Sequence, residues 1–423
     1  MVLRWLYSVL FYLAVPFLIY RLFKRAKQNP AYKERIPERF GHYSVSPLKQ
    51  CLWIHTVSVG EFIAAQPLIE RLLERYPQMP LVITTMTPTG SDRVKAAMGD
   101  RVVHVYLPYD LPHAIKRFLA HFRPSSLVIM ETELWPNLIH YTSKRGVPVI
   151  IANARLSPKS AAGYHKARLI ARPMLREISI IAAQAKPDGE RFIELGLPPA
   201  SLRITGTVKF DLAVDDQVLA KATQLRRLWG EQRPVFIAAS THEGEDEQVL
   251  EAFKMIRKEL TDSLLVIVPR HPERFQPVAD LVAGQGWALA RHSEGGNIDS
   301  DIAVVVGDTM GELLVLLGAS DVAFIGGSLE PVGGHNMLEA LAVGTPAITG
   351  PHVFNFAMVA QMLTELEVLE TVTTPLGLGG AVLRLLTNTE QRQILAAKGK
   401  QVVDENRGAI DRLLTIVESY IPN

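Results

Sequence analysis

Short apolar runs alternate with longer amphipathic segments along most of this chain. In the first half, the apolar runs that predict strands are residues 52–56, 81–85, 102–106, 127–130, 147–152 and 178–183. The segments between them with helical periodicity include residues 61–75, 111–121 and 134–145. Strands that alternate with helices predict a parallel sheet covered on both faces. Because both faces of such a sheet are buried, its strands are apolar throughout rather than alternating.

The same pattern restarts in the second half of the chain. Its predicted strands are residues 235–239, 264–268, 303–306, 322–325 and 347–349, and its predicted helices are residues 245–259, 310–317, 336–343 and 355–366. Residues 211–234 are charged and contain no strand candidate, which indicates a connector between two domains. We therefore expect an α/β fold of two Rossmann-like, doubly wound lobes with a cleft between them. Ligands of such sheets bind outside the carboxyl ends of the strands.

The N-terminal residues differ from the rest, because residues 5–20 form an uncharged, largely apolar run. A basic cluster follows it directly: Arg21, Lys24, Arg25 and Lys27. A secretory signal would carry its basic residues before the apolar run and a small-residue cleavage site after it, so this reading is disfavoured. A spanning helix needs about 20 apolar residues, so this run is slightly short, and a spanning helix and an interfacial helix both remain open. Either would anchor the chain, and the basic cluster would keep the lobes in the cytoplasm.

These patterns divide the chain into three parts: an anchor at residues 1–27, an N-terminal lobe at 28–212 and a C-terminal lobe at 213–423. A length of 423 residues suits two domains. The net charge of +2 gives no overall attraction to nucleic acid. The single cysteine, Cys51, excludes an intramolecular disulfide and a thiolate zinc cluster. No Walker motif, nucleophile elbow or zinc-binding H-E-x-x-H is present, and we expect neither a metal nor a cofactor.

Acidic and basic side chains follow the predicted strands of the first lobe. Glu61 opens a helix after the first strand, where it is either a first-turn acid favoured by the helix dipole or a general base at the cleft. Glu131 and Glu133 follow another buried strand and could orient an acceptor or cap the next helix. Lys209 lies where this lobe ends, and could face an anionic donor or be a solvated surface lysine.

The second lobe carries a stronger pattern for binding an anion. Arg270 follows a strand and could clamp a phosphate with two hydrogen bonds. A glycine-rich segment, residues 326–339, joins a buried strand to a helix that we expect to begin near Asn336. Free backbone amides at that helix start would bind an anion, although the glycines could serve packing alone. Glu339 lies three residues after Asn336, on one side of the first turn, and could accept hydrogen bonds from ribose hydroxyls.

Taken together, the motifs resemble the 3-deoxy-D-manno-octulosonic acid (Kdo) transferases of Gram-negative bacteria, a family with the two-lobed GT-B fold. The resemblance covers essentially the whole chain and rests, beside the basic anchor, on Ser58-Val-Gly-Glu61, Glu131-Thr-Glu-Leu-Trp-Pro136, Pro269-Arg-His-Pro272, Met310-Gly-Glu312 and Gly333-Gly-His-Asn-Met-Leu-Glu339. It implies inverting transfer of Kdo from CMP-Kdo to the lipid A precursor (lipid IVA) in lipopolysaccharide core biosynthesis. The implied place is the cytoplasmic side of the bacterial inner membrane.

The resemblance also implies roles for individual residues. Glu61 would be the catalytic base, and Glu131 and Lys209 would support the transition state. The implied CMP-binding residues are Pro269, Arg270, Met310, Gly311, Glu312, Asn336, Met337, Leu338 and Glu339.

Two other functions suit the same architecture. A nucleotide-sugar 2-epimerase would share the two lobes, but it would be soluble and act on a UDP-sugar, and the predicted anchor argues against it. A membrane-tethered nucleotide-sugar binding module would keep the glycine-rich loop and need no base. Turnover, and its dependence on Glu61, would separate these hypotheses.

Overall fold

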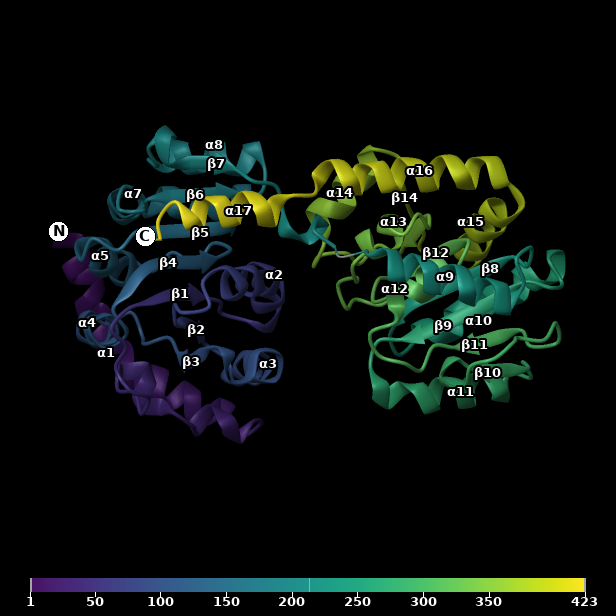
Figure 1. Cartoon of the computed structure of the whole chain (residues 1–423), viewed down its shortest axis with the longest axis horizontal. Helices are drawn as coiled ribbons and strands as arrows, with labels where there is room; N and C mark the ends of the chain where they lie inside the picture. Colours follow the sequence, from purple (N-terminus) through teal and green to yellow (C-terminus); the bar gives the residue numbers. More distant parts are fainter. Residues whose placement is uncertain (1, 213, 422–423) are drawn as a thin grey trace. The chain divides into compact units, whose positions relative to one another are not determined.

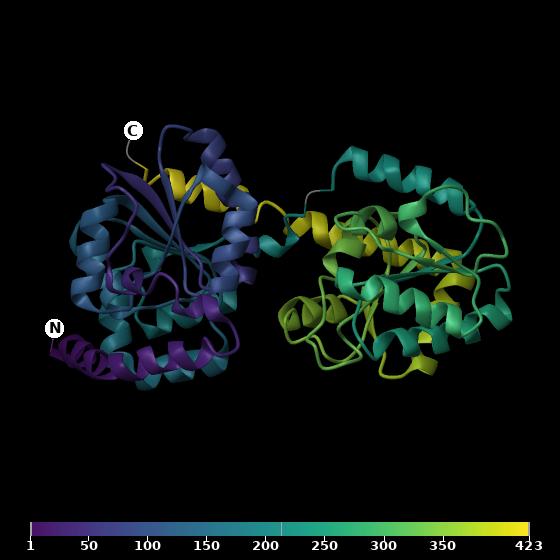
Figure 2. The ribbon, with the colours of Figure 1, turned by 90° about the horizontal axis from the view of Figure 1, so that it is seen from below.

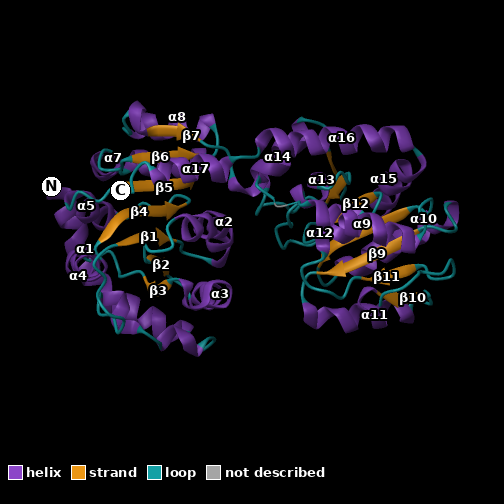
Figure 3. Cartoon of the chain, viewed as in Figure 1, coloured by secondary structure: helices purple, strands orange, loops and turns teal. Residues whose placement is uncertain are grey.

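The computed structural model describes residues 2–212 and 214–421, which form two compact units (Figure 1). One unit contains the chain as far as Asp211 together with the segment from Gly408 onward, and the other runs from Leu212 to Arg407. Each unit is built on one seven-stranded parallel sheet with helices packed against it (Figure 3). The predicted fold of two Rossmann-like α/β lobes is therefore confirmed.

The sheet of the first unit has the strand order β3-β2-β1-β4-β5-β6-β7. Its strands are β1 (Cys51–His55), β2 (Leu81–Thr85), β3 (Val103–Tyr106), β4 (Pro124–Met130), β5 (Val149–Ala154), β6 (Ile180–Ala183) and β7 (Leu202–Ile204). Its helices are α1 (Val2–Arg25), α2 (Val59–Arg75), α3 (Pro88–Met98), α4 (Pro112–Phe122), α5 (Pro136–Lys144), α6 (Pro158–Lys166), α7 (Arg168–Leu175), α8 (Lys186–Leu195) and α17 (Ala409–Glu418). Six of the seven strands lie where the apolar runs predicted them, and β7 was not predicted.

Alternate residues of the central strands bury opposite faces of this sheet. Trp53 of β1 packs with Phe118 of α4 in one apolar layer, whereas Ile54 packs with Phe62 of α2 in the other. All five residues of β1 are buried. Both faces thus exclude water, which explains why the strand sequences show no polar alternation.

The second sheet has the order β10-β11-β9-β8-β12-β13-β14. Its strands are β8 (Val235–Thr241), β9 (Leu264–Pro269), β10 (Leu289–Arg291), β11 (Val304–Val306), β12 (Val322–Ile325), β13 (Ala347–Thr349) and β14 (Leu369–Thr371). Its helices are α9 (Asp216–Trp229), α10 (Glu245–Glu259), α11 (Phe275–Gly284), α12 (Leu313–Gly318), α13 (Leu338–Ala342), α14 (Ala357–Glu365), α15 (Pro375–Thr387) and α16 (Thr389–Asn406). The edge strands β10 and β14 were not predicted.

The predicted connector at residues 211–234 is mostly helix. Asp215 caps α9, accepting a hydrogen bond from the amide of Val218, and Trp229 is buried at the other end. Helix α9 packs against α12 of the same unit, so this charged segment belongs to the second lobe.

The C-terminal helix returns to the first unit. The Asp211 carboxylate accepts hydrogen bonds from the amides of Gly408, at 2.6 Å, and Ile410, at 2.5 Å. Leu413 and Val417 of α17 then pack in the apolar layer that contains α2. In this respect the observed units differ from the expected division at residue 212, which assigned the entire C-terminus to the second lobe.

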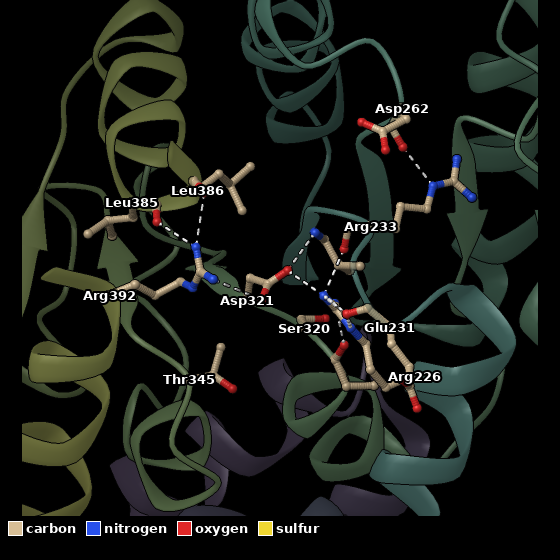
Figure 4. A network of polar contacts seen from close by, with 12 residues as sticks. Arg226, Glu231, Arg233, Asp262, Ser320, Asp321, Thr345, Leu385, Leu386 and Arg392 are labelled. Atoms are coloured by element: carbon tan, nitrogen blue, oxygen red, sulfur yellow. Dashed lines mark hydrogen bonds and ion pairs between the residues drawn. The ribbon is translucent and has the colours of Figure 1, made fainter. Parts of the chain in front are cut away.

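An ionic network lies at the amino ends of β8 and β12 (Figure 4). Asp321 accepts hydrogen bonds from Arg226, at 2.9 Å, and from the amide of Val235, at 2.8 Å, and it lies 3.7 Å from Arg392. Arg392 also donates to the carbonyl oxygens at the end of α15. These charges join α9 and α16 to the sheet edge opposite the carboxyl ends, which indicates a structural role.

Candidate functional site

Each sheet has one switch point, where neighbouring strands continue into loops that diverge to opposite sides. In the first sheet it lies between β1 and β4, which are adjacent although β2 and β3 intervene in sequence. Glu61 follows β1 and Glu131 follows β4. Both predicted acids therefore lie at the carboxyl edge where open α/β sheets bind ligands.

The first turn of α2 holds the Glu61 carboxylate in place. Glu61 Oε2 accepts a hydrogen bond from the Val57 amide at 2.6 Å, and Oε1 accepts one from the Ser58 hydroxyl at 3.1 Å. The Ser58 oxygen in turn accepts from the Glu61 amide at 3.4 Å, which makes Ser58 the N-cap. This reciprocal arrangement resembles a capping box. Glu61 is thus a first-turn acid, as one reading of the sequence had it, and it is only 8% exposed.

Burial gives this carboxylate an unusual proton affinity. Desolvation, together with the charges of Glu131 and Glu133, raises the pKa of Glu61 to about 7, although hydrogen bonds from Val57 and Ser58 lower it. A base whose pKa lies near the working pH is effective in general base catalysis. The capped position and the capacity to accept a proton therefore coexist in one residue.

Glu131 adopts a backbone conformation that is uncommon for a residue with a side chain. Its φ angle is 59°, and its amide donates to the carbonyl oxygen of Ala152 at 2.8 Å. Such left-handed residues cost about 1–2 kcal/mol and cluster at functional sites. Lys209 lies in a short 3-10 helix, Val208–Phe210, where burial lowers its pKa and the charge of Glu131 opposes this shift. The electrostatic coupling of Glu131 to both Glu61 and Lys209 means that the structure gathers all three predicted residues at one edge.

Asn153 begins a stretch, residues 153–157, that follows a predicted strand, and it supports this cluster. It is fully buried at the end of β5, has a φ angle of 55°, and accepts a hydrogen bond from the Val208 amide at 3.3 Å through Oδ1. It therefore fixes the segment that carries Lys209. Its position in a stretch directly after a predicted strand was the available signal, because asparagine tolerates the left-handed region.

In the second sheet the switch point lies between β8 and β12, where the glycine-rich loop begins. The fully buried carboxylate of Glu245 accepts four amide hydrogen bonds there, from His242, Gly327, Ser328 and Leu329, at 2.6–2.9 Å. A Cβ at Gly326 would come within 2.6 Å of the Ser240 carbonyl oxygen, so the two loops pack backbone to backbone. Glu245 therefore occupies the amides at the start of the glycine-rich loop, whereas the expected anion site lies at its other end, near Asn336.

Asn336 and Glu339 pair as their spacing indicated. The Asn336 side chain donates to Glu339 Oε1 at 3.3 Å and accepts from the Leu338 amide at 3.2 Å, just before the short helix α13. Burial raises the pKa of Glu339, and the charge of Arg270 opposes this shift, which places Arg270 near the carboxylate. The side chains of Met337 and Leu338 are fully buried in the core. Met337 and Leu338 could therefore contact a ligand only through their backbone, whereas the side chains of Asn336 and Glu339 are only partly buried.

Three histidines lie near Arg270, and the sequence analysis did not select them as site residues. His242 and His335 stack with ring centroids 5.0 Å apart and their Nε2 atoms 2.8 Å apart, and His271 meets the His242 ring edge-on at 5.5 Å. Burial, followed by the charges of His242, Arg270 and His271, lowers the pKa of His335 to about 4. Within residues 2–212 and 214–421, no three potential ligands are arranged to hold a metal ion. The imidazoles and the guanidinium instead provide N–H donors for an anion; each histidine comes from a different loop at this edge.

The remaining predicted residues lie along the same carboxyl edge. Pro269 ends β9, and residues 310–312 follow β11, which pairs with β9. Met310 is 62% exposed, and Gly311 has a φ angle of 85°. A Glu312 carboxylate oxygen lies 3.3 Å from His292 Nε2. The segment after β11 is thus open to solvent, with Glu312 held by a neighbouring side chain.

Comparison with known proteins gives the following similarities. A family model described as 3-deoxy-D-manno-octulosonic-acid transferase (kdotransferase) matches residues 34–212. The 3-deoxy-D-manno-octulosonic acid transferase of Haemophilus influenzae is 45% identical over 421 residues, which are 99% of each chain. The C-terminal CMP-Kdo binding domain of WaaA from Acinetobacter baumannii is 32% identical and covers 45% of this chain and 99% of its own, with a TM-score of 0.43. The UDP-GlcNAc 2-epimerase of Neisseria meningitidis is 14% identical, covers 84% of this chain and 99% of its own with a TM-score of 0.53, and shows the shared fold alone.

Proposed function

This chain belongs to the 3-deoxy-D-manno-octulosonic acid (Kdo) transferase family, and on that premise we propose that it transfers Kdo from CMP-Kdo to lipid IVA at the cytoplasmic leaflet of the bacterial inner membrane. The observation that carries the chemical part is the buried Glu61 carboxylate at the first switch point, with its pKa raised to about 7. The epimerase and binding-module alternatives have no comparable support, because the full-length relative is a transferase.

Glu61 acts as the base in this proposal. Its carboxylate takes the proton from an acceptor hydroxyl while that oxygen forms a bond to the anomeric carbon of Kdo. The bond between that carbon and the phosphate oxygen breaks on the opposite side, so the configuration inverts and CMP departs. Lys209 contributes a positive charge, and the charge of Glu131 favours the protonated lysine and raises the basicity of Glu61.

The donor nucleotide is proposed to bind at the second switch point. Arg270, with three imidazoles around it, supplies hydrogen-bond donors for the single phosphate of CMP. The nearby Glu339 carboxylate, held by Asn336, suits the ribose hydroxyls. Pro269 and the segment of Met310, Gly311 and Glu312 would complete the nucleotide site, with Met337 and Leu338 contributing backbone only.

Transfer to lipid IVA can be measured directly. Purified full-length protein would be incubated with lipid IVA and with CMP-Kdo generated in place, and mass spectrometry would follow the lipid. We expect the wild type to add Kdo masses, whose number counts the residues transferred. Glu61→Gln is expected to lose most turnover while still binding CMP, because the amide cannot accept the proton. Glu74→Gln is the matched control, since Glu74 is an exposed acid on the same helix.

Two results would contradict the proposal in different ways. If the wild type binds CMP but leaves lipid IVA unmodified, the assigned acceptor is wrong. If Glu61→Gln transfers Kdo as fast as Glu74→Gln does, the transferase assignment stands and the assigned base is wrong.

A further inference from the structure

Helix α1 lies along the first lobe (Figure 2). The side chains that contact the lobe include six at alternating intervals of four and three residues: Arg4, Ser8, Phe11, Val15, Leu18 and Leu22. Leu22 packs with Tyr109 and Leu111 before α4, and Phe11, Val15 and Leu18 pack against the same cluster. A helix of 24 residues is about 36 Å long, and this stripe runs from one end to the other.

Polar contacts fix the same face of the helix. The buried Ser8 hydroxyl exchanges hydrogen bonds with the Asn137 side chain at 3.0–3.1 Å, and Arg4 donates to Asn137 Oδ1 at 3.0 Å. The backbone N–H of Asn137 in turn donates to the carboxylate of the buried Asp110 at 2.9 Å. Farther along, the Tyr12 hydroxyl meets His113 Nδ1 at 2.6 Å. Undocking α1 would remove partners from buried polar groups of the folded lobe.

The opposite face of α1 is apolar and exposed. Its large exposed side chains are Leu3, Trp5, Leu6, Leu10, Leu13, Phe17, Tyr20 and Phe23. Leu13, at the middle of the helix, is 73% exposed. Leu3 also lines, with Leu169 of α7, a pocket of about 300 Å³ that extends this surface onto the lobe. An exposed apolar face of this extent marks an interaction surface.

By length and composition, α1 is the one described helix that could cross a membrane. We propose instead that it lies in the plane of the membrane surface, with its outer face in the lipid and its inner face on the lobe. Because α1 is docked along its length, the part of the lobe that it contacts would lie at nearly the same depth in the membrane as the helix. Crossing the bilayer would carry α4 into the hydrocarbon with its exposed Lys116 and Arg117, where charged side chains are costly.

The charges around this face suit an anionic lipid surface. No acidic residue occurs among residues 1–33 or 134–176. Exposed basic side chains follow the apolar face of α1 and surround α7: Arg21, Lys24, Arg25, Lys27, Lys33, Lys166, Arg168, Arg172 and Arg176. An amphipathic helix with an apolar face and basic neighbours is typical of interfacial binding. This inference rests on the membrane association in the proposed function. Its test measures the depth of α1 in the lipid and not the transfer of Kdo, so the in-plane orientation and the transferase activity can each be disproved separately.

Fluorescence quenching by lipid bromines measures the depth of each part of the helix. Leu6, Leu13 and Tyr20 share the outer face at intervals of seven residues, and each would be replaced by tryptophan in a Trp5→Phe background. The parent Trp5→Phe protein provides the background from the other tryptophans. The vesicles would contain phosphatidylglycerol and phosphatidylcholine brominated either near the headgroup or near the chain end. An in-plane helix predicts the same shallow quenching at all three positions.

A spanning helix gives a different profile, with Leu13→Trp deep and the other two variants shallow, and that result would overturn the proposal. Absence of quenching at all three positions would overturn it as well, because the face would then not contact lipid. All three positions are exposed, so the variants are expected to fold.

Cross-linking in membranes provides the second measurement. A short bis-maleimide should join Tyr12→Cys to His113→Cys in vesicle-bound protein, because these side chains touch in the docked state. Leu13→Cys with His113→Cys is the matched control and should not react, since Leu13 points outward. The native Cys51 is fully buried and adds little background. Cross-linking that occurs in detergent but disappears on vesicles would mean that the helix undocks to span, which contradicts the proposal.

Discussion

Ser58 and Glu61 hold one another across the first turn of α2: the Ser58 hydroxyl donates to Glu61 Oε1 at 3.1 Å and accepts from the Glu61 amide at 3.4 Å. These contacts stabilise the start of the helix and also stabilise the charged form of the carboxylate. Burial acts in the opposite direction and dominates, so the pKa of Glu61 is raised to about 7. The position and the basicity of the proposed base therefore depend on the same small group of atoms.

The first prediction concerns the pH dependence of transfer. Only the deprotonated Glu61 can accept a proton, so kcat/KM should fall about tenfold per pH unit below an apparent pKa of about 7 and be level above it. Initial rates between pH 5.5 and 8.5, with lipid IVA as acceptor, measure this profile. The exposed-acid control Glu74→Gln should reproduce the wild-type curve. A rate that stays constant from pH 6 to 8 would show that no group with this pKa limits transfer.

The second prediction separates the two roles of Ser58. Ser58→Ala removes a hydrogen bond that lowers the pKa of Glu61, so the acidic limb of the rate profile should move to higher pH. It also removes an N-cap and should reduce the free energy of unfolding by about 1 kcal/mol. Ser157→Ala is the matched control, because Ser157 caps α6 in the same lobe through a 3.1 Å bond from the Ser160 amide. It should lose similar stability and leave the profile unchanged; equal profiles for both variants would contradict the prediction.

The central strands could be predicted from the sequence because they are buried on both faces, and the edge strands could not. β7, β10 and β14 have three residues each, and side chains such as Arg203 and Ala290 are half-buried or exposed. Such short segments carry too few apolar positions to stand out from a loop. Helix α9 was not predicted for a related reason: among its residues only Ala222 and Trp229 are buried, so it has no clear apolar stripe.

The location of Glu61, Glu131 and Arg270 at the carboxyl edges of the sheets could be predicted, because each residue follows a strand. Interactions between distant segments could not be predicted. The Glu245 carboxylate accepts hydrogen bonds from amides that lie more than 80 residues away in sequence, and no local pattern indicates such a contact. The His242 and His335 pair is separated by 93 residues and depends on the same packing of loops.

The third prediction concerns Glu245 and the loop that it holds. Glu245→Gln replaces one acceptor oxygen by an NH2 group that faces backbone amides, and each unsatisfied buried group costs about 1–3 kcal/mol. We expect a lower melting temperature and faster hydrogen exchange at the amides of Gly327, Ser328 and Leu329. Glu247→Gln is the control, because Glu247 is exposed in the same first turn of α10. Unchanged exchange at these three amides would contradict the role of Glu245 as their acceptor.

The fourth prediction tests whether Arg270 binds the phosphate of the nucleotide. A hydrogen bond to a charged group contributes about 1.5–3 kcal/mol, so Arg270→Ala should weaken CMP binding by about 10- to 100-fold. Arg270→Lys should recover only part of this loss, since an ammonium cannot form the paired hydrogen bonds of a guanidinium. Arg227→Ala removes an exposed arginine of the same unit and should leave affinity unchanged. Titration calorimetry with CMP and with cytidine gives the decisive comparison: cytidine lacks the phosphate, so Arg270→Ala should bind it as the wild type does. An equal loss for both ligands would mean that Arg270 shapes the site without contacting the phosphate.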